Sequence, residues 1–232
     1  MGFERYAIYY SPEPGCELAE FGEQWLGRDA YGQSVTRHRS LADSENLQAL
    51  IATPARYGFH GTVKPPFQLT RDEHPRRLKD VLDRFVSKCK VVTAPPLKLT
   101  AIGNFLALCP GGIAGPNKDI DDLAERCVYE FDYFRAPLSD EEFQRKKNDE
   151  LSSGQLENLN RWGYPFVFDE YRFHLTLTGA LSADEKSRVE DILRPQVEAL
   201  PDEPFTINSL CLFGDPGNGE PFRLIERYPL GT

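Results

Sequence analysis

The sequence has no long apolar run and no paired cysteines. Its 232 residues contain no stretch near the roughly 18–20 apolar residues that a membrane-spanning helix needs. The first ten residues, MGFERYAIYY, lack the basic region and the apolar core of a signal peptide. The five cysteines are dispersed without a C-x-x-C pair, which is typical of reduced, buried thiols. These absences predict a soluble, cytoplasmic protein that spans no membrane.

Positive charge is also scarce. Lysine and arginine number 27 against 36 acidic residues, so the net charge is −9. A long nucleic acid would meet a repulsive field, whereas a small anion needs only a few well-placed cations. The phosphate-binding pattern G-x-x-x-x-G-K-[ST] is absent, so P-loop ATP chemistry is not indicated. The sequence therefore favours a small anionic substrate over a long duplex.

Local patterns predict a mixture of helices and strands. Strands are expected where aromatic and β-branched residues cluster, at 6–10, 57–64, 97–103, 104–108, 171–179, 205–213 and 222–227. Helices are expected where apolar residues recur with helical spacing, at 18–26, 44–51, 74–89, 119–131, 139–159 and 182–199. The second of these helices should end before Pro54, because the residue before a proline disfavours helical backbone.

Two stretches of the chain share one order of elements. Residues 57–108 and 171–227 each run from a strand through a helix to a hairpin. The repeat predicts an α+β fold, with one domain over residues 1–232 that has two pseudo-symmetric lobes. Largely antiparallel sheets flanked by helices should form the lobes, with an active-site cleft between them. The helices at about 117–160 are expected to be an insertion between the lobes.

The repeat is sharpest in two matched strands, Y-G-F-H-G-T-V and Y-R-F-H-L-T-L. Because alternate residues of a strand point to the same side, each strand should have a polar face and an apolar face. The polar faces are expected to hold Gly58, His60, Thr62 and Lys64 in the first strand and Arg172, His174, Thr176 and Thr178 in the second. Donors, cations and imidazoles are costly to bury unpaired, so these faces should line a wet cleft. A single strand histidine is ordinarily a core residue, but a matched pair favours one shared site.

This pattern suits the hydrolysis of a phosphodiester. The reaction needs a base for the attacking water and an acid for the leaving oxygen, and His60 and His174 can share these roles because histidine titrates near neutrality. The threonine two residues beyond each histidine can donate to a phosphate oxygen as charge builds there. Lys64 and Arg172 would add cationic stabilisation on the same faces, unless they are solvated surface charges.

The residues around the two motifs resemble a known superfamily. The segments RYGFHGTVKPPFQL (56–69) and YRFHLTLTG (171–179) resemble the two-histidine phosphoesterases, which include cyclic nucleotide phosphodiesterases and 2′–5′ RNA ligase-like proteins. They look closest to a branch found with bacterial phosphonate-utilisation genes. The resemblance implies acid and base roles for the motif histidines and phosphate binding by the motif threonines, namely His60, His174, Thr62 and Thr176. It also implies that no metal or other cofactor takes part. Gly61 fills a position often taken by a bulkier residue, which should loosen the strand.

The function expected from these features is the metal-independent hydrolysis of a cyclic phosphodiester on a ribose. The substrate should be a small phosphorylated ribose, such as the phosphoribosyl cyclic phosphate of phosphonate breakdown, or a 2′,3′-cyclic nucleotide or RNA end. Two alternatives stay open: a non-catalytic protein that binds nucleotides or RNA ends in the same cleft, and 2′–5′ RNA ligation. His38 lies between Arg37 and Arg39, either in a basic rim for a second phosphate or in a solvated loop.

Overall fold

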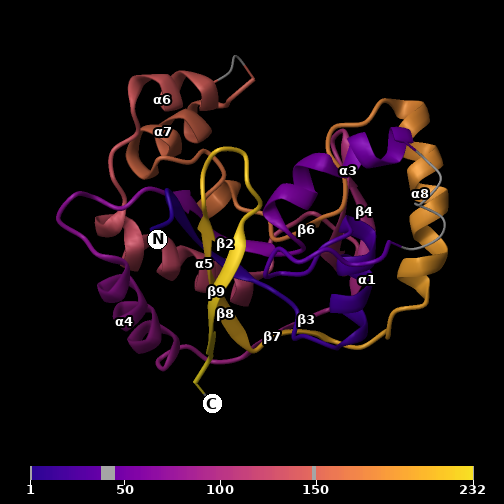
Figure 1. The fold of residues 1–232 in the computed structure, drawn as a ribbon, viewed down its shortest axis with the longest axis horizontal. Helices are drawn as coiled ribbons and strands as arrows, with labels where there is room; N and C mark the ends of the chain where they lie inside the picture. Colours follow the sequence, from indigo (N-terminus) through magenta and orange to yellow (C-terminus); the bar gives the residue numbers. More distant parts are fainter. Residues whose placement is uncertain (1, 38–44, 148–149, 232) are drawn as a thin grey trace.

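Helices and strands are interspersed along the chain (Figure 1). The computed structural model describes residues 2–37, 45–147 and 150–231. The helices are α1 (Glu17–Leu26), α3 (Glu45–Tyr57), α4 (Pro75–Val86), α5 (Lys118–Phe131), α6 (Asp140–Lys146), α7 (Ser153–Trp162) and α8 (Ala183–Glu198), with short 3-10 turns η1 (Asp132–Phe134) and η2 (Phe168–Glu170). The strands are β1 (Arg5–Tyr10), β2 (Gly61–Phe67), β3 (Val92–Ala94), β4 (Leu97–Ile102), β5 (Phe105–Pro110), β6 (Leu175–Thr176), β7 (Phe205–Ile207), β8 (Ser209–Asp215) and β9 (Arg223–Pro229).

Seven strands form one sheet in the order β4-β5-β6-β2-β1-β8-β9, and β3 pairs with β7 apart from it. Neighbouring strands run antiparallel, so the predicted α+β class with largely antiparallel sheets is confirmed. The two motif strands, β2 and β6, are neighbours in the middle. The β4–β5 hairpin of the first repeat is next to β6, the motif strand of the second repeat. The β8–β9 hairpin of the second repeat reaches β2, the motif strand of the first repeat, through β1. The two repeat units therefore share one continuous sheet.

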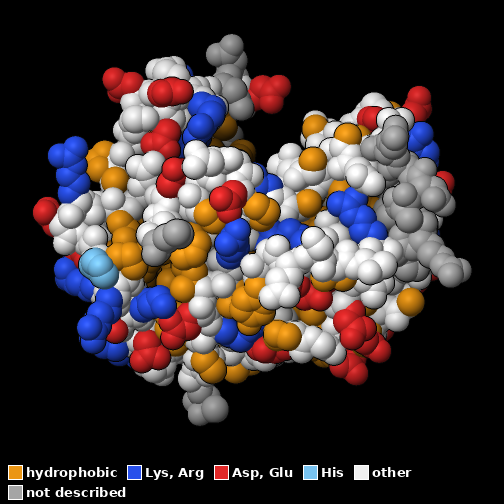
Figure 2. Space-filling model, viewed as in Figure 1, with side chains coloured by type: hydrophobic (Ala, Val, Ile, Leu, Met, Phe, Trp, Pro, Cys, Tyr) orange, Lys and Arg blue, Asp and Glu red, His pale blue; other side chains and the backbone are white. Residues whose placement is uncertain are grey.

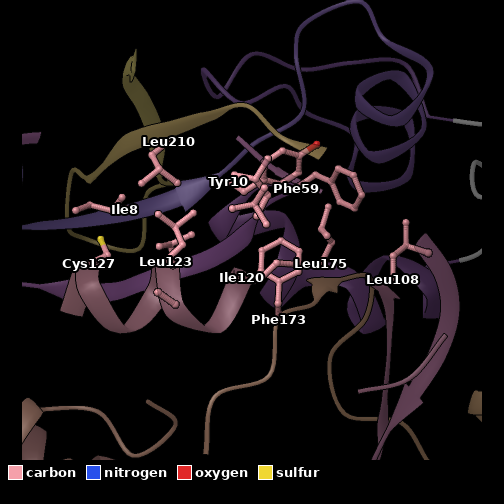
Figure 3. Packing of buried hydrophobic residues seen from close by; sticks show 14 of the residues in the cluster. Ile8, Tyr10, Phe59, Leu108, Ile120, Leu123, Cys127, Phe173, Leu175 and Leu210 are labelled. Carbon is pink, nitrogen blue, oxygen red and sulfur yellow. The ribbon is translucent and has the colours of Figure 1, made fainter. Parts of the chain in front are cut away.

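One face of the sheet is covered by helix α5. Figure 3 shows Ile120, Leu123 and Cys127 of this helix turned toward the sheet, where Ile8 and Leu210 lie. All five side chains are buried in the main hydrophobic core. Helical spacing of apolar residues in α5 gives it the one-sided stripe that this packing requires.

The opposite face of the sheet has a smaller apolar cluster. Its buried members are Ala7, Tyr9, Cys211, Phe213, Phe222 and Leu224. The ring of Tyr9 stacks on the ring of His60, so the first motif histidine belongs to this face. The helix-covered face thus supplies most of the core, and the other face positions the motif.

Helix α3 continues through Pro54 and ends at Tyr57, so the predicted stop before the proline is wrong. A proline inside a helix leaves the carbonyl four residues earlier without an amide donor. That carbonyl, of Leu50, instead accepts a 2.6 Å hydrogen bond from the N–H of Gly179, shortly after β6. The segment after the second motif thus compensates for the proline. Ser44, the predicted start of this helix, lies outside the described residues.

The motif strands are shorter than predicted. The sequence favours extended backbone over 57–64, but Tyr57 ends α3 and β2 begins at Gly61. Between them, Gly58 has a φ of +85°, in the left-handed region that favours glycine. The second motif strand, β6, has two residues. Each motif histidine therefore lies at the end of a turn, immediately before its strand.

The predicted helix at 139–159 is divided into α6 and α7. Each begins with its own capping box, Ser139 with Glu142 and Ser152 with Gln155. A capping box satisfies the free N–H groups of a helix start, so the second box begins a new helix. Figure 1 shows α6 and α7 stacked together at one end of the molecule.

All five cysteines are free, and four of them are buried. Cys16 is exposed, and its Sγ accepts a hydrogen bond from the N–H of Ala19 at the start of α1. The prediction of buried thiols is therefore wrong for Cys16, which acts as a helix cap. Within the described ranges, none of the helices has the length and apolarity needed to cross a bilayer.

Candidate active site

The two motif strands pair with each other, and Gly61 of β2 lies opposite Leu175 of β6. In an antiparallel pair, this register sets each motif histidine opposite the other strand's motif threonine, in the pairs His60–Thr176 and Thr62–His174. Side chains that lie directly opposite have Cβ atoms about 4.5–5.5 Å apart. All four side chains are partly exposed, whereas the residues between them are buried. The structure thus brings the four predicted residues together.

Both imidazoles are held in the same way. The Nδ1 of His60 lies 2.8 Å from the carbonyl oxygen of Gly58, and the Nδ1 of His174 lies 2.8 Å from that of Arg172. A carbonyl only accepts, so each Nδ1 carries the proton and each Nε2 is the basic nitrogen of the neutral ring. The Nε2 of His60 lies 3.2 Å from the hydroxyl of Thr62. The two motifs therefore present equivalent basic nitrogens.

Burial sets the charge of both rings. It lowers the pKa of His60 to about 4, although the hydrogen bond to the Gly58 carbonyl favours the protonated ring. The positive charges of His174 and Arg28 lower this pKa further. Burial also lowers the pKa of His174. Both rings are therefore neutral at pH 7, and an anion between them would raise both pKa values by stabilising the imidazolium forms.

Three residues beside His60 were not expected from the sequence. The ring of Tyr9 is stacked on the imidazole, with centroids 3.8 Å apart, and the ring of Tyr57 lies 6.4 Å away. Arg28 is 7% exposed and donates to two carbonyls in the last turn of α3, at 3.1 Å each. It thereby fixes the turn that leads into the motif. The alternation of residues along β1 could have indicated that Tyr9 shares a face with the motif. No local sequence pattern indicates a buried arginine such as Arg28.

The prediction that Lys64 shares the face of the motif histidine is wrong. Thr62 pairs with Tyr9 but Lys64 pairs with Ile8, so β2 has an extra residue between these pairs. A one-residue bulge turns the following side chains to the other face. Lys64 is 2% exposed, and its Nζ donates to the carbonyl of Val128 in α5 at 3.4 Å. Burial on this side lowers its pKa to about 8.

Arg172 and Thr178 also make backbone contacts. The guanidinium of Arg172 donates to two carbonyls in the preceding turn, and its own carbonyl orients His174. Thr178 was predicted on the polar face, but it is 1% exposed and its hydroxyl accepts the N–H of Leu106 in β5. The expected place of Thr178 in a wet cleft is therefore wrong, because β5 covers it.

Two expectations concern bound ions. In the part of the chain that the structure describes, no three side chains of His, Cys, Asp or Glu gather as metal ligands. His38 and Arg39, the candidates for a basic rim, lie outside the described residues.

The family described as "Protein of unknown function (DUF1045)" matches residues 62–223 of the chain. This match spans well over half of the sequence and includes both motif threonines and the second motif histidine. The chain belongs to the DUF1045 family.

Curated relatives of this DUF1045 chain are longer than it is. A protein named "Ribose 1,5-bisphosphate phosphokinase PhnN" from Janthinobacterium sp. (strain Marseille) is 32% identical over 231 residues, covering 97% of this chain and 50% of that protein. A protein of the same name from Laribacter hongkongensis (strain HLHK9) is 30% identical over 223 residues, covering 95% of this chain and 50% of that protein. The DUF1045 chain thus spans about half the length of these relatives.

Solved structures similar to the DUF1045 chain include E. coli LigT complexed with ATP, with 12% identity, a TM-score of 0.46 and 99% of each chain covered. Another is titled "Crystal structure of phosphoesterase", with 12% identity, a TM-score of 0.45 and the same coverage. The resemblance to the two-histidine phosphoesterases rests on the two motif strands of the chain itself.

Proposed function

We propose that the chain is a phosphoesterase that opens a cyclic phosphodiester on a ribose by two-histidine acid–base catalysis. The observation that carries this proposal is the pairing of β2 with β6, which places two equivalent histidines on one face. Their Nδ1 atoms are both occupied by carbonyls, so both Nε2 atoms are available for proton transfer.

The two histidines would take opposite roles. We assign the base to His60, because burial lowers its pKa to about 4 and so keeps its Nε2 unprotonated at neutral pH. His60 would remove a proton from water as the water oxygen bonds to phosphorus. His174, protonated in the complex with the anion, would give its proton to the ribose oxygen as the bond from phosphorus to that oxygen breaks. The products are a phosphate monoester and a free hydroxyl, and proton exchange with solvent restores both rings.

The motif threonines would stabilise the phosphate. Thr62 and Thr176 lie on the same face as the histidines, each across the strand pair from the other motif's histidine. Their hydroxyls would donate to the two non-bridging oxygens, where charge increases in the transition state. Arg172 would add positive charge from the turn before His174. Lys64 has no place in this scheme, because it lies on the helix-covered side.

The names of the relatives favour one substrate within this class. Both names specify ribose 1,5-bisphosphate, and this chain corresponds to half of each protein. Opening the 1,2-cyclic phosphate of a 5-phosphorylated ribose at its 2-oxygen leaves ribose 1,5-bisphosphate. The half of each relative that matches this chain would then produce ribose 1,5-bisphosphate, which is the compound in the relative's name. We therefore favour the phosphoribosyl cyclic phosphate over a 2′,3′-cyclic nucleotide or an RNA end.

Turnover in the presence of EDTA tests this proposal. Wild type, His60→Ala and His174→Ala are assayed with the phosphoribosyl cyclic phosphate and with 2′,3′-cyclic AMP. Each substitution should lower kcat by about 10²–10⁴-fold, the usual contribution of a general acid or base. Wild-type rates in both variants would refute the mechanism. If the wild-type protein binds these compounds without opening them, the non-catalytic binding function is the correct one.

A further inference from the structure

Two arginines beside the candidate active site share one carboxylate. Arg5 donates to Asp215 through its Nε at 2.9 Å, and Arg56 lies 3.5 Å from the same oxygen. The other oxygen of Asp215 accepts the N–H of Gly217 at 3.0 Å, and the side chain of Asp215 is 1% exposed. Two guanidinium groups on one carboxylate leave one positive charge uncompensated. In the described chain, the Nε of Arg56 is buried without a hydrogen-bond partner.

Lys146, the last residue of α6, adds a third cation. Its Nζ donates to the carbonyl of Gly163 at 2.8 Å and lies 5.8 Å from the ring centroid of Tyr164. Burial lowers the pKa of Lys146 to about 8, Glu142 opposes this change, and Arg5 adds to it. Within the described residues, no carboxylate forms a salt bridge with Lys146. A phosphate would supply the missing negative charge.

This cluster of cations adjoins the motif histidine. Arg5 and Tyr9 lie on the same side of β1, about 13 Å apart along the strand at ~3.3 Å per residue. The ring of Tyr9 stacks on that of His60. Tyr57 makes a second link, because its ring lies 6.4 Å from that of His60 and 5.8 Å from the Cζ of Arg56. Tyr9 and Tyr57 therefore connect the cation cluster to the motif histidine.

Two of the three cations also line a recess. Arg5 and Lys146 lie around a narrow pocket between β1–β2 and the α6–α7 segment, which Lys64 lines as well and Arg56 does not. Figure 2 shows a hollow between the α6–α7 pair and the α3 side of the molecule, with Lys and Arg side chains on its floor. Among the described lining residues of the pocket, Glu142 is the one carboxylate, and the N–H of Ser139 already donates to it. The recess is therefore positively charged in a protein whose net charge is −9.

We propose that Arg5, Arg56 and Lys146 form a second anion-binding subsite, which holds a phosphate monoester on the far side of the substrate's sugar from its cyclic phosphate. This inference rests on the proposed function, because it names a second feature of the same substrate. Guanidinium groups match the geometry of phosphate oxygens, and the Arg56 side chain is 36% exposed, so its guanidinium can reach an anion. The subsite selects a doubly phosphorylated sugar over a nucleoside cyclic phosphate.

Substrate selectivity tests the subsite. Values of kcat/KM are measured for 5-phosphoribosyl 1,2-cyclic phosphate and for 2′,3′-cyclic AMP, which lacks the second phosphate. In Arg56→Gln and Lys146→Gln, the ratio of the two values should fall about tenfold, mainly through KM for the doubly phosphorylated substrate. Arg223→Gln is the matched control, because this exposed arginine pairs with Glu220 at the surface, and its ratio should equal that of wild type. An unchanged ratio in both subsite variants would overturn the inference.

Binding of ribose 5-phosphate, measured by calorimetry, separates this inference from the proposed function. It should weaken in Arg56→Gln and Lys146→Gln even if neither cyclic substrate is turned over, and excess inorganic phosphate should compete with it. Equal affinity in wild type and both variants would refute the subsite, whatever the catalytic result. If His60→Ala and His174→Ala kept wild-type turnover, the proposed chemistry would be refuted. The binding of ribose 5-phosphate would still show whether the subsite exists.

Discussion

The ring of Phe173 fills the space in which a Cβ on Gly61 would lie, with its Cζ 2.3 Å from that position. Gly61 is the residue of β2 that pairs with β6, and Phe173 immediately precedes the second motif histidine. The sequence suggested that a glycine here loosens the strand. In the structure, the glycine instead lets the aromatic residue of one motif pack against the backbone of the other.

Replacing Gly61 with alanine should therefore disturb both motifs. The added Cβ overlaps the ring of Phe173, and overpacking of this kind costs about 1–3 kcal/mol of unfolding free energy. Urea unfolding should show this loss, and kcat/KM should fall because His60 and Thr62 flank the changed residue. Gly2→Ala is the control, because nothing lies within 4 Å of a Cβ there. Wild-type stability in Gly61→Ala would contradict the packing argument, and Phe173→Leu should restore part of the loss.

The pH dependence of kcat/KM should reflect the buried histidines. The productive free enzyme has one neutral and one protonated ring, so activity passes through a maximum between the two pKa values of the pair. Burial lowers the pKa of His60 to about 4 and lowers that of His174 below the ordinary histidine value of 6.5. The maximum should therefore lie below pH 6.5. Circular dichroism at each pH separates inactivation from unfolding, and a maximum at neutral or alkaline pH would contradict the burial argument.

Features that depend on short-range patterns were predictable from the sequence. Alternation along two short segments placed the four motif residues on one face, and the hairpin expected at 97–108 is present as β4–β5. Ser182 and Glu185 form the capping box that begins α8. Each of these features is determined by residues close together in the chain, so no tertiary contact is needed to infer it.

Features that depend on distant contacts were not predictable. Pro54 is accommodated in α3 because the N–H of Gly179 bonds to the carbonyl that the proline leaves free. Lys64 is turned away from the motif face by a bulge that is defined only by the pairing of β2 with β1. Arg5 belongs to β1 and Lys146 to α6, so only the folded chain brings them together. Propensity and periodicity carry no information on such pairs.

Lys64→Met tests the corrected position of this lysine. Burial lowers the pKa of Lys64 from 10.5 to about 8, so the unfolded chain holds the proton more tightly. The unfolding free energy of wild type should thus rise between pH 8 and 10.5, by on the order of 3 kcal/mol from this group. Relative to wild type, the methionine variant should lack this rise and keep its kcat. A large loss of kcat would instead return Lys64 to the cyclic-phosphate site. If the stability of both proteins changed with pH in the same way, the burial of Lys64 as a charged group would be contradicted.

Tyr171→Phe tests the link between the two motifs. The hydroxyl of Tyr171 donates a 2.7 Å hydrogen bond to the backbone carbonyl of Thr62, which joins the turn before the second motif to the first motif strand. Burial raises the pKa of Tyr171 well above 10, so the hydroxyl remains a donor throughout the working range. Its loss should cost about 1 kcal/mol of unfolding free energy, the usual net value of one hydrogen bond. It should also lower kcat, because the backbone that carries Thr62 loses its restraint. Tyr129→Phe is the control, since that side chain is 54% exposed. Equal stability and equal kcat in Tyr171→Phe and in this control would show that the bond does not hold the motifs together.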